Sequence, residues 1–582
     1  MSRNDEVANR LEEFADLLEA MDVAYKPNAY RRAAENIREH PQPIEQLAAT
    51  GQDAVESIDR VGEAIASKVI EYVETGSIEE LEELRAELPV DMDGLTAVEG
   101  VGPKTVGTLF EALQITTLDE LEAAAEAGEI RELRGFGEKT ESNILDNIAF
   151  ARETQRRERL GDARPVADRL LSYLRSGEAI DRAEVAGSIR RWRPTVGDID
   201  VLVASEANEA VVDRFTGWEA VEAVVQAGEH KASVRARGMQ VDLRVVAPDE
   251  YGAALQYFTG SKAHNVHLRN VAIDRGLKLN EYGVFDVSGV PEGEDSQRAG
   301  DRLGGKTEAE MYGALDLPTI EPELREDTGE IEAAADGHLP DLVTIDDVRG
   351  DCHTHSDHSD GRHSIADMVE AAAALGYEYH CVTDHASGPG IIEGIGLSDD
   401  DLREQIGTIE RIRADAPIDV LAGVETNIAA DGSLSTADSV LCELEIVVAS
   451  PHSALSQDRE RATDRLCRAI EHPEVDVIGH PTGRLLNSRE GLDLAYERIA
   501  RHAAEHETAL EVNADPARLD LDGTGVRAAI EAGATIAVNT DAHGPDALEY
   551  VRYGVHTARR GWAEADDVLN CLSAAELRRW LD

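Results

Sequence analysis

The segment DCHTHSDHSDG, residues 351–361, concentrates side chains that can bind metal ions. His353 and His355 are two residues apart, so both face one side of a strand end, and Asp360 follows five residues later. More histidines and acids stand at the ends of predicted strands, in VTDH, AGVE, ASPH, IGHP and NTDAH. The nine candidate ligands are His353, His355, Asp360, His385, Glu425, His452, His480, Asp541 and His543.

Mixed nitrogen and oxygen ligands suit Zn²⁺ or Mn²⁺, and nine of them exceed the needs of one ion. We therefore expect two or three ions at this site. A single histidine is usually exposed or hydrogen-bonded without function, but that explanation does not easily cover all nine. His358 and His363 fall outside the pattern and are expected at the surface or behind the ligands.

A second cluster of acids is predicted in AGSIRRWRPTVGDIDVLVA, residues 186–204. Asp198 and Asp200 share one face of a strand, and Asp242 in QVDLRVV can join them from another strand. Three carboxylates can hold two Mg²⁺ ions for phosphoryl transfer, one at an attacking 3′-hydroxyl and one at a leaving pyrophosphate. A triphosphate would meet the residues just before the aspartates, Gly187, Ser188 and Arg191. A lone DxD more often marks solvated acids, but this spacing with a third aspartate favours catalysis.

These side chains need strands that hold them in place. From about residue 346, strands alternate with helices, which predicts a parallel sheet or barrel whose strand ends converge on one mouth. Residues 180–290 contain the strand patterns AEVAGS, DIDVLVA and MQVDLRVVA. Residues 1–150 read as short helices with glycine-centred turns, in a weak repeat at DRVGEAIASKVIEYV, VEGVGPKTVGTLFEAL and LRGFGEKTESNIL.

The glycine turns GVGPKT and GFGEKT precede helix starts, where unpaired backbone N–H groups can bind a phosphate. They resemble helix-hairpin-helix motifs, which bind the DNA backbone without reading its sequence. A plain helical hairpin with glycine at its turn is the alternative, and two matched copies make it less favourable. The matched residues are Gly100, Gly102 and Lys104 in one copy and Gly135, Gly137 and Lys139 in the other.

The composition is strongly acidic, with 57 basic and 116 acidic residues and a net charge of −59. This sign is unusual for a nucleic-acid binder. Few lysines and many aspartates resemble halophilic archaeal proteins, and in molar salt a Debye length of about 3 Å screens repulsion from DNA. Five cysteines without a CxxC pair predict a reducing compartment. We expect a cytoplasmic protein without membrane segments.

The stretches YKPNAYRRAAENI and DRVGEAIASKVIEYV are similar to the N-terminal domain of family X DNA polymerases. In that family a lysine can form a Schiff base with an abasic sugar, and Lys68 matches it, with Tyr30 and Lys26 in supporting positions. The sequence departs from polymerase beta at Ala64, where that protein has a second lysine. It departs again at Arg60, which replaces the first glycine of the hairpin.

The segment YFTGSKAHNVHLRNVAIDRGLKLNEYG, residues 257–283, resembles the thumb region of the same family. The resemblance implies that Tyr257, Phe258 and Gly260 line the sugar pocket. It further implies that Asn265 contacts the nucleotide and Arg269 the template. Gly197 joins the predicted nucleotide contacts, while Lys262 stands where the family pattern has an acid.

The nine metal-ligand candidates resemble the complete trinuclear set of the PHP (polymerase and histidinol phosphatase) domain. The resemblance implies hydrolysis of a phosphoester by a metal-bound hydroxide. The expected fold is multidomain, with α-helical helix-hairpin-helix domains, an α/β nucleotidyltransferase palm with a thumb, and a C-terminal (β/α) PHP barrel. The predicted segments are a lyase-like domain 1–90, fingers 91–155, palm 156–260, thumb 261–330, linker 331–347 and PHP domain 348–582.

The predicted function is DNA repair by a monomer. The first half would fill gapped or nicked DNA with dNTPs, and the second would process termini as a 3′–5′ exonuclease, 3′-phosphatase or abasic-site endonuclease. Three alternatives stay open. The PHP domain could be only structural, it could act on a small phosphoester, or the chain could be a DNA-binding scaffold.

Overall fold

The computed structural model describes residues 3–582 apart from 22, 24, 25, 41, 43, 59, 97, 99, 156, 292–295, 392, 393 and 490. Tyr25, Asp59 and Glu99, which belong to motifs quoted above, lie outside the described residues. The chain forms two compact units. Unit 1 comprises residues 1–157, 173–184 and 197–316, and unit 2 comprises residues 158–172, 185–196 and 317–582.

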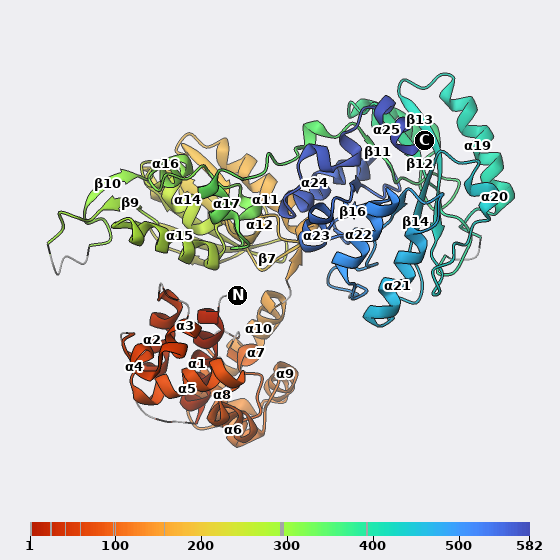
Figure 1. Cartoon of the computed structure of the whole chain (residues 1–582). Helices are drawn as coiled ribbons and strands as arrows, with labels where there is room; N and C mark the ends of the chain where they lie inside the picture. The colour runs from red at the N-terminus through yellow and green to blue at the C-terminus, as the bar shows by residue number, and fades with distance from the viewer. Residues whose placement is uncertain are drawn as a thin grey trace. The chain divides into compact units, whose positions relative to one another are not determined.

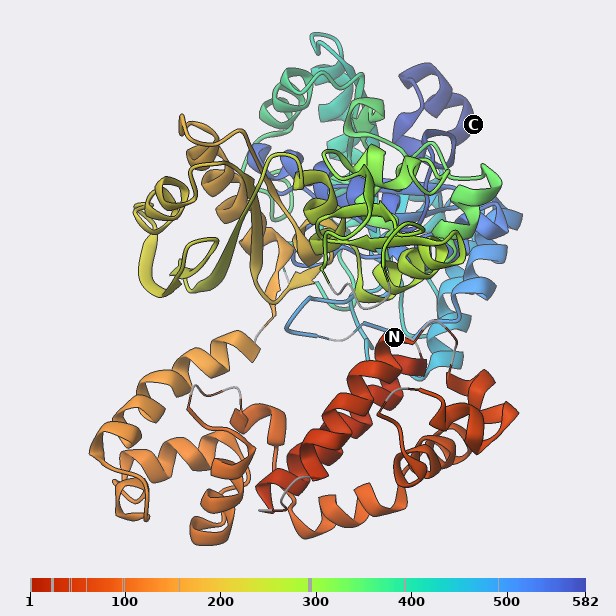
Figure 2. The same ribbon diagram turned by 90° about the vertical axis from the view of Figure 1, so that its left-hand side faces the viewer.

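The N-terminal part of unit 1 is built from short helices (Figures 1 and 2). They share one apolar core that runs from Val7 to Ile148, so the predicted segments 1–90 and 91–155 are not separated by a gap in the core. The α-helices are α1 Arg3–Ala20, α2 Lys26–Glu39, α3 Ile44–Thr50, α4 Gln52–Glu56, α5 Glu63–Thr75, α6 Glu79–Glu87, α7 Met92–Thr96, α8 Pro103–Leu113, α9 Leu118–Glu126 and α10 Glu138–Gln155.

The palm sheet has five strands in the order β2-β4-β7-β6-β5, and β4 pairs with β7 in parallel. Alternating burial along β6 and β7 shows that one face of each strand packs on the core. The elements are α11 Leu160–Arg175, β2 Arg182–Val185, α12 Gly187–Arg190, β4 Ile199–Ala204, α13 Asn208–Thr216, β5 Val221–Ala227, β6 Lys231–Ala236, β7 Met239–Val246 and α14 Tyr251–Thr259. In unit 2, the short strands β1 Glu158–Arg159 and β3 Thr195–Val196 pair antiparallel.

The thumb follows with one helix, a three-stranded antiparallel sheet in the order β10-β9-β8, and a final short helix. Its elements are α15 Lys262–Asp274, β8 Leu277–Asn280, β9 Gly283–Asp286, β10 Asp301–Gly304 and α16 Glu308–Gly313.

Most of unit 2 is a seven-stranded parallel barrel whose strands follow chain order from β11 to β17. A parallel bridge from Thr354 to Ala542 links the ends of the first and last strands. Helices surround the strands (Figure 1). The elements are β11 Gly350–Asp351, α18 Ile365–Ala374, β12 Tyr379–Val382, α19 Asp399–Arg413, β13 Asp419–Asn427, α20 Asp438–Leu441, β14 Ile446–Ser450, α21 Arg459–Ile470, β15 Val477–Ile478, α22 Tyr496–His506, β16 Ala509–Asn513, α23 Gly523–Ala532, β17 Ile536–Asn539, α24 Val551–Arg560 and α25 Ala574–Leu581. The predicted barrel is confirmed.

The segment 331–347, predicted as a linker, is folded within unit 2. Helix α17 (Glu330–Asp336) opens it, and Ile331 and Ala334 are buried. The backbone N–H of the buried Val343 donates to the carbonyl of Ala563 at 2.9 Å. Four of its apolar side chains, Ile331, Ala334, Leu342 and Val343, are buried, so this segment packs against the rest of its unit.

Candidate functional site

The nine predicted ligands of the barrel converge on one mouth. Glu425, near the end of β13, lies at the centre with no exposed surface. One or the other of its carboxylate oxygens is 2.6–3.6 Å from a ring nitrogen of each of five histidines: His353, His355, His385, His452 and His480. His353 and His355 share the loop after β11, while His385, His452 and His480 follow β12, β14 and β15. Strand ends that meet at one mouth are what the βα pattern predicts.

The remaining three candidate ligands, Asp360, Asp541 and His543, lie beside these histidines. Asp541 lies 2.9 Å from Nε2 of His355. Asp360 lies 3.2 Å from His543 and 3.6 Å from His385. Three sets of donor atoms are close enough to share an ion, namely His355, Asp360, His385 and His543; His353, His355 and Glu425; and His385, Glu425 and His452.

Several ligand atoms are buried without a hydrogen bond among the described residues, including Nε2 of His353, both ring nitrogens of His355 and Oδ1 of Asp541. Buried polar atoms are normally paired, so these atoms fit a metal that takes the place of the missing partners. The backbone is left-handed at two of the candidate ligands, with φ of 25° at His480 and 53° at Asp541. Such conformations are costly and cluster at functional sites.

The electrostatics of the cluster keep its acids ionised. Burial alone would raise the pKa of Glu425, but the charges of His385, His452 and His353 outweigh it and hold that pKa well below its usual range. Burial alone would also raise the pKa of Asp541, but His353 and His355 outweigh burial and lower that pKa. Ionised carboxylates are the form that binds a cation.

Residues behind the ligands were not predicted from the sequence. Glu511 on β16 accepts from Nδ1 of His353 at 2.7 Å and from the backbone N–H of His480 at 2.6 Å. Asn427 accepts from Nδ1 of His452 at 2.7 Å. Such partners fix the orientation of metal-binding histidines. The strand pattern ALEVNA, residues 509–514, was the available signal, since Glu511 and Asn513 are two residues apart and lie on the same face of it.

A buried aspartate holds the loop that carries Asp360. Asp384 accepts from the backbone N–H and the hydroxyl of Ser356, from the hydroxyl of Ser359 and from the amide of Gln405, at 2.6–2.7 Å. His358 and His363 are both exposed, as expected.

The palm brings its three aspartates together through strand register. Asp200 on β4 lies opposite Asp242 on β7, and Asp198 directly precedes β4. Their oxygens lie within 4.8 Å of one another, and all three side chains are half-buried. Burial, followed by the charge of Asp242, raises the pKa of Asp198. Like charges at this spacing are the arrangement that a divalent cation relieves.

The predicted sugar-pocket residues follow in unit 1. Tyr257 and Phe258 end α14 with their rings edge-on at 5.1 Å. Asn265 on α15 donates to the carbonyl of Tyr257 at 2.6 Å, and a Cβ on Gly260 would lie 2.4 Å from its Oδ1. Only glycine fits there without displacement. Arg269 lies one turn further along α15 and is half-buried.

The predicted triphosphate residues lie in unit 2. Gly187 and Ser188 open the short helix α12, and Nε of Arg191 donates to Glu326 at 3.1 Å. Glu326 is 135 residues away in sequence and was not predicted as a partner. Gly197 lies in unit 1, where Nη1 of Arg157 is 3.9 Å from the position of an added Cβ.

The glycine turns repeat in three dimensions. Gly100 and Gly135 have left-handed φ values of 87° and 98°, and Gly102 and Gly137 precede α8 and α10. A Cβ on any of these four glycines would meet no atom within 4 Å, so the backbone there is open to a ligand. Lys104 and Lys139 are exposed beside them. Arg60, which replaces a glycine in the first copy, still adopts φ of 64°.

Lys68 forms an ion pair with Glu80 at 2.5 Å and lies over the ring of Phe14. Burial lowers its pKa, but the bond to Glu80 and the neighbouring Tyr30 outweigh burial and raise the pKa. A protonated amine is not a nucleophile, so attack on a sugar would require Glu80 to release it. Lys26, at the start of α2, is exposed.

Among the described residues, no helix is both long and apolar enough to cross a membrane. Four family profiles match the chain. They are a helix-hairpin-helix domain at residues 2–78, a SAM-like helix-hairpin-helix tandem at 92–149, the DNA polymerase beta thumb at 254–326 and the PHP domain at 351–515.

Curated relatives match the same regions. DNA polymerase/3′-5′ exonuclease PolX of Bacillus subtilis is 33% identical over 564 residues, which cover 96% of each chain. DNA polymerase lambda of Rattus norvegicus is 24% identical over 351 residues, 56% of each chain. A protein named "Probable phosphatase" from Thermoanaerobacter sp. (strain X514) is 32% identical over 208 residues, 33% of this chain and 78% of that one. The chain therefore belongs to the family X DNA polymerases that carry a PHP domain.

Proposed function

We propose that this protein fills short gaps in DNA during repair and processes 3′ termini at its own second site. One observation carries the proposal. The chain holds two distinct clusters of metal-binding side chains, three aspartates in the palm and nine ligands in the barrel. The relative from Bacillus subtilis, whose name combines a polymerase with a 3′-5′ exonuclease, supports the pairing.

In the palm, Asp198, Asp200 and Asp242 would hold two Mg²⁺ ions, which supply charge neutralisation at the attacking and leaving oxygens. Gly187, Ser188 and Arg191 would receive the triphosphate, and Gly197 would add a further contact to the nucleotide. Tyr257, Phe258, Gly260 and Asn265 would shape the pocket for the sugar and base of a dNTP. Arg269 would contact the template.

In the barrel, the nine ligands would hold two or three Mn²⁺ or Zn²⁺ ions, which supply a hydroxide nucleophile near neutral pH. Glu511 and Asn427 orient His353 and His452, and Asp384 holds the loop of Asp360. The open glycine turns at Gly100, Gly102, Gly135 and Gly137, with Lys104 and Lys139, would bind the phosphates of gapped or nicked DNA. We take the protein to act as a monomer.

Lyase activity at Lys68 depends on release of its ion pair, because Glu80 holds the amine in its protonated form. DNA bound nearby would have to displace Glu80 for the amine to react. Borohydride trapping on abasic DNA should then yield a covalent adduct that Lys68→Ala abolishes.

A primer blocked by a 3′-phosphate tests the pairing of the two sites. In high KCl with Mg²⁺, Mn²⁺ and dNTPs, the protein should extend this primer across a one-nucleotide gap only after removing the phosphate. His355→Ala should extend a 3′-hydroxyl primer normally and leave the blocked primer unchanged. Extension of the blocked primer by His355→Ala would show that the barrel does not clean the terminus.

A further inference from the structure

The segment 185–196, here called the nucleotide loop, is held in place by contacts with residues that follow the barrel's last strand. Trp192 in this loop is almost fully buried, and its ring stacks on His556 of α24 with centroids 3.6 Å apart and planes 8° from parallel. The guanidinium of Arg164 lies over the same ring at 4.6 Å. Stacked aromatic rings and a cation over a ring face are both stabilising.

Trp192 could not hold its own backbone in place. Its φ is 53°, in the left-handed region that a bulky residue rarely adopts. Surrounding contacts must therefore impose the conformation. Because Trp192 directly follows Arg191, the ring stack also fixes where Arg191 projects.

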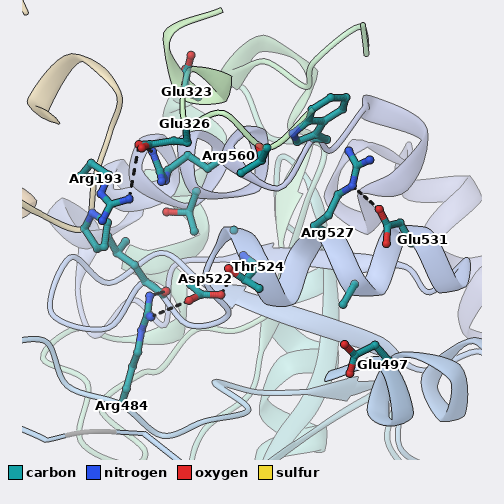
Figure 3. A pocket seen from close by; sticks show the side chains of 17 residues that line it. Arg193, Glu323, Glu326, Arg484, Glu497, Asp522, Thr524, Arg527, Glu531 and Arg560 are labelled. Carbon is teal, nitrogen blue, oxygen red and sulfur yellow. Dashed lines mark hydrogen bonds and ion pairs between the residues drawn. The ribbon is translucent and has the colours of Figure 1, made fainter. Parts of the chain in front are cut away.

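A second clamp acts on Arg191 itself. Oε1 of Glu326 accepts from Nε of Arg191 and from Nη1 of Arg560, both at 3.1 Å, and lies 3.6 Å from Arg193. Nη1 of Arg560 also donates to the backbone carbonyl of Arg191 at 2.7 Å. Figure 3 shows Glu326 between Arg193 and Arg560 at one wall of a cavity of about 530 Å³.

Helix α24 is held firmly behind both clamps. Glu323 is 3% exposed and lies 2.5 Å from Nδ1 of His556 and 2.7 Å from Nε of Arg559. Arg552 pairs with Asp168 at 2.7 Å. Glu323 is a buried acid between two basic groups, so its loss would leave an uncompensated charge.

None of these residues belongs to the nine barrel ligands. His556 and Arg560 lie 13 and 17 residues beyond His543. Their ring stack and hydrogen bonds connect them to the nucleotide loop and to residues 323–326. We infer that His556, Arg560 and Glu326 are positioning residues for nucleotide binding at the polymerase site. The PHP domain thus supports the polymerase by holding Arg191, and this inference rests on the proposed function.

The test is steady-state gap filling by full-length His556→Ala, with dNTP concentration varied. We expect the KM for dNTP to rise about three- to tenfold, the size of a lost ring stack, while kcat changes less. His556→Phe keeps a ring and should stay nearer to the unaltered protein. Trimming by the barrel should be unchanged in both. His502→Ala, a histidine of similar exposure on α22, is the matched control.

A double-mutant cycle sharpens the result. Trp192→Ala combined with His556→Ala should raise KM no further than the more severe single change, because both remove the same stack. Additive effects would contradict the clamp. A KM within twofold of the unaltered protein in folded His556→Ala would overturn the inference, and so would a loss of trimming equal to the loss of extension.

If His556→Ala fails to fold, Arg560→Lys replaces it, since lysine keeps the charge but cannot bond both Glu326 and the Arg191 carbonyl as arginine does. An unchanged KM in Arg560→Lys would then overturn the inference. Absence of gap filling in the unaltered protein is a different outcome, because it would contradict the proposed function itself.

Discussion

The palm and the barrel gather their candidate metal ligands in opposite ways. The palm uses three half-buried aspartates, two of them opposed by the register of β4 and β7. The barrel uses six histidines and three acids from six strands and their loops, and His353, His355 and Glu425 are at most 1% exposed. Like-charged and accessible ligands suit ions that arrive with a nucleotide, whereas buried mixed ligands with fixed partners suit ions that stay.

Glu425→Gln should produce the largest separation between the two regions. Glu425 contacts five histidines and belongs to two of the three sets of donor atoms, so its loss disturbs both of them. We expect trimming to fall about 10³-fold, about 4 kcal/mol in the barrier, while gap filling is unchanged. Metal content per chain should fall with it.

Glu443→Gln is the matched control, since Glu443 pairs with Arg403 at the surface. Trimming within tenfold of the unaltered protein in Glu425→Gln would contradict a central role for this carboxylate.

Glu511→Gln tests whether the barrel depends on residues behind its ligands. Glutamine carries no charge, and it cannot accept both the hydrogen bond from His353 and the one from the backbone N–H of His480 as glutamate does. We expect the Mn²⁺ concentration needed for half-maximal trimming to rise about 10- to 100-fold. The palm counterpart, Gln240→Ala, removes a neutral amide that donates to Asp242 at 3.1 Å, and it should change the Mg²⁺ requirement of extension less. Equal effects would remove this difference between the regions.

Asp476 is an acid of the barrel whose pKa, unlike that of Glu425, is not lowered by neighbouring histidines. It accepts from the backbone N–H of Val447, yet burial raises its pKa to about 7. The folded state therefore keeps a proton that the unfolded state has lost between about pH 4 and 7. Stability falls as pH rises through this window and levels off above it.

Asp476→Asn should remove this loss, by at most about 4 kcal/mol at pH 8. Melting temperatures at pH 5 and pH 8 in constant KCl measure it, and the gain should be clearly larger at pH 8 than at pH 5, because only part of the loss has developed at pH 5. An equal gain at both values would assign the effect to something other than ionisation.

The convergence of the nine candidate ligands could be predicted from the sequence because they lie at the ends of recognisable strands. His385, His452 and His480 each follow an apolar run, and parallel strands bring such ends together whatever the loops do. The grouping of the palm aspartates could also be predicted from the sequence, since the two-residue period of a strand places Asp198 and Asp200 on one face.

The supporting contacts could not be predicted, because they depend on three-dimensional register. Glu511 lies 158 residues from His353, and Glu326 lies 135 residues from Arg191. No local pattern links such pairs. The sequence predicts a linker at 331–347, but Val343 in that segment is buried within unit 2. Arg60 adopts a glycine-like φ that residue type alone argues against.

The most direct test of two separate centres is one gapped duplex assayed with Asp200→Asn and His355→Ala in high KCl with Mg²⁺ and Mn²⁺. Extension is followed with dNTPs and 3′ trimming without them. Asp200→Asn should lose extension and keep trimming, and His355→Ala should do the reverse. Loss of both activities in one folded variant, or survival of extension in Asp200→Asn, would contradict the division between palm and barrel.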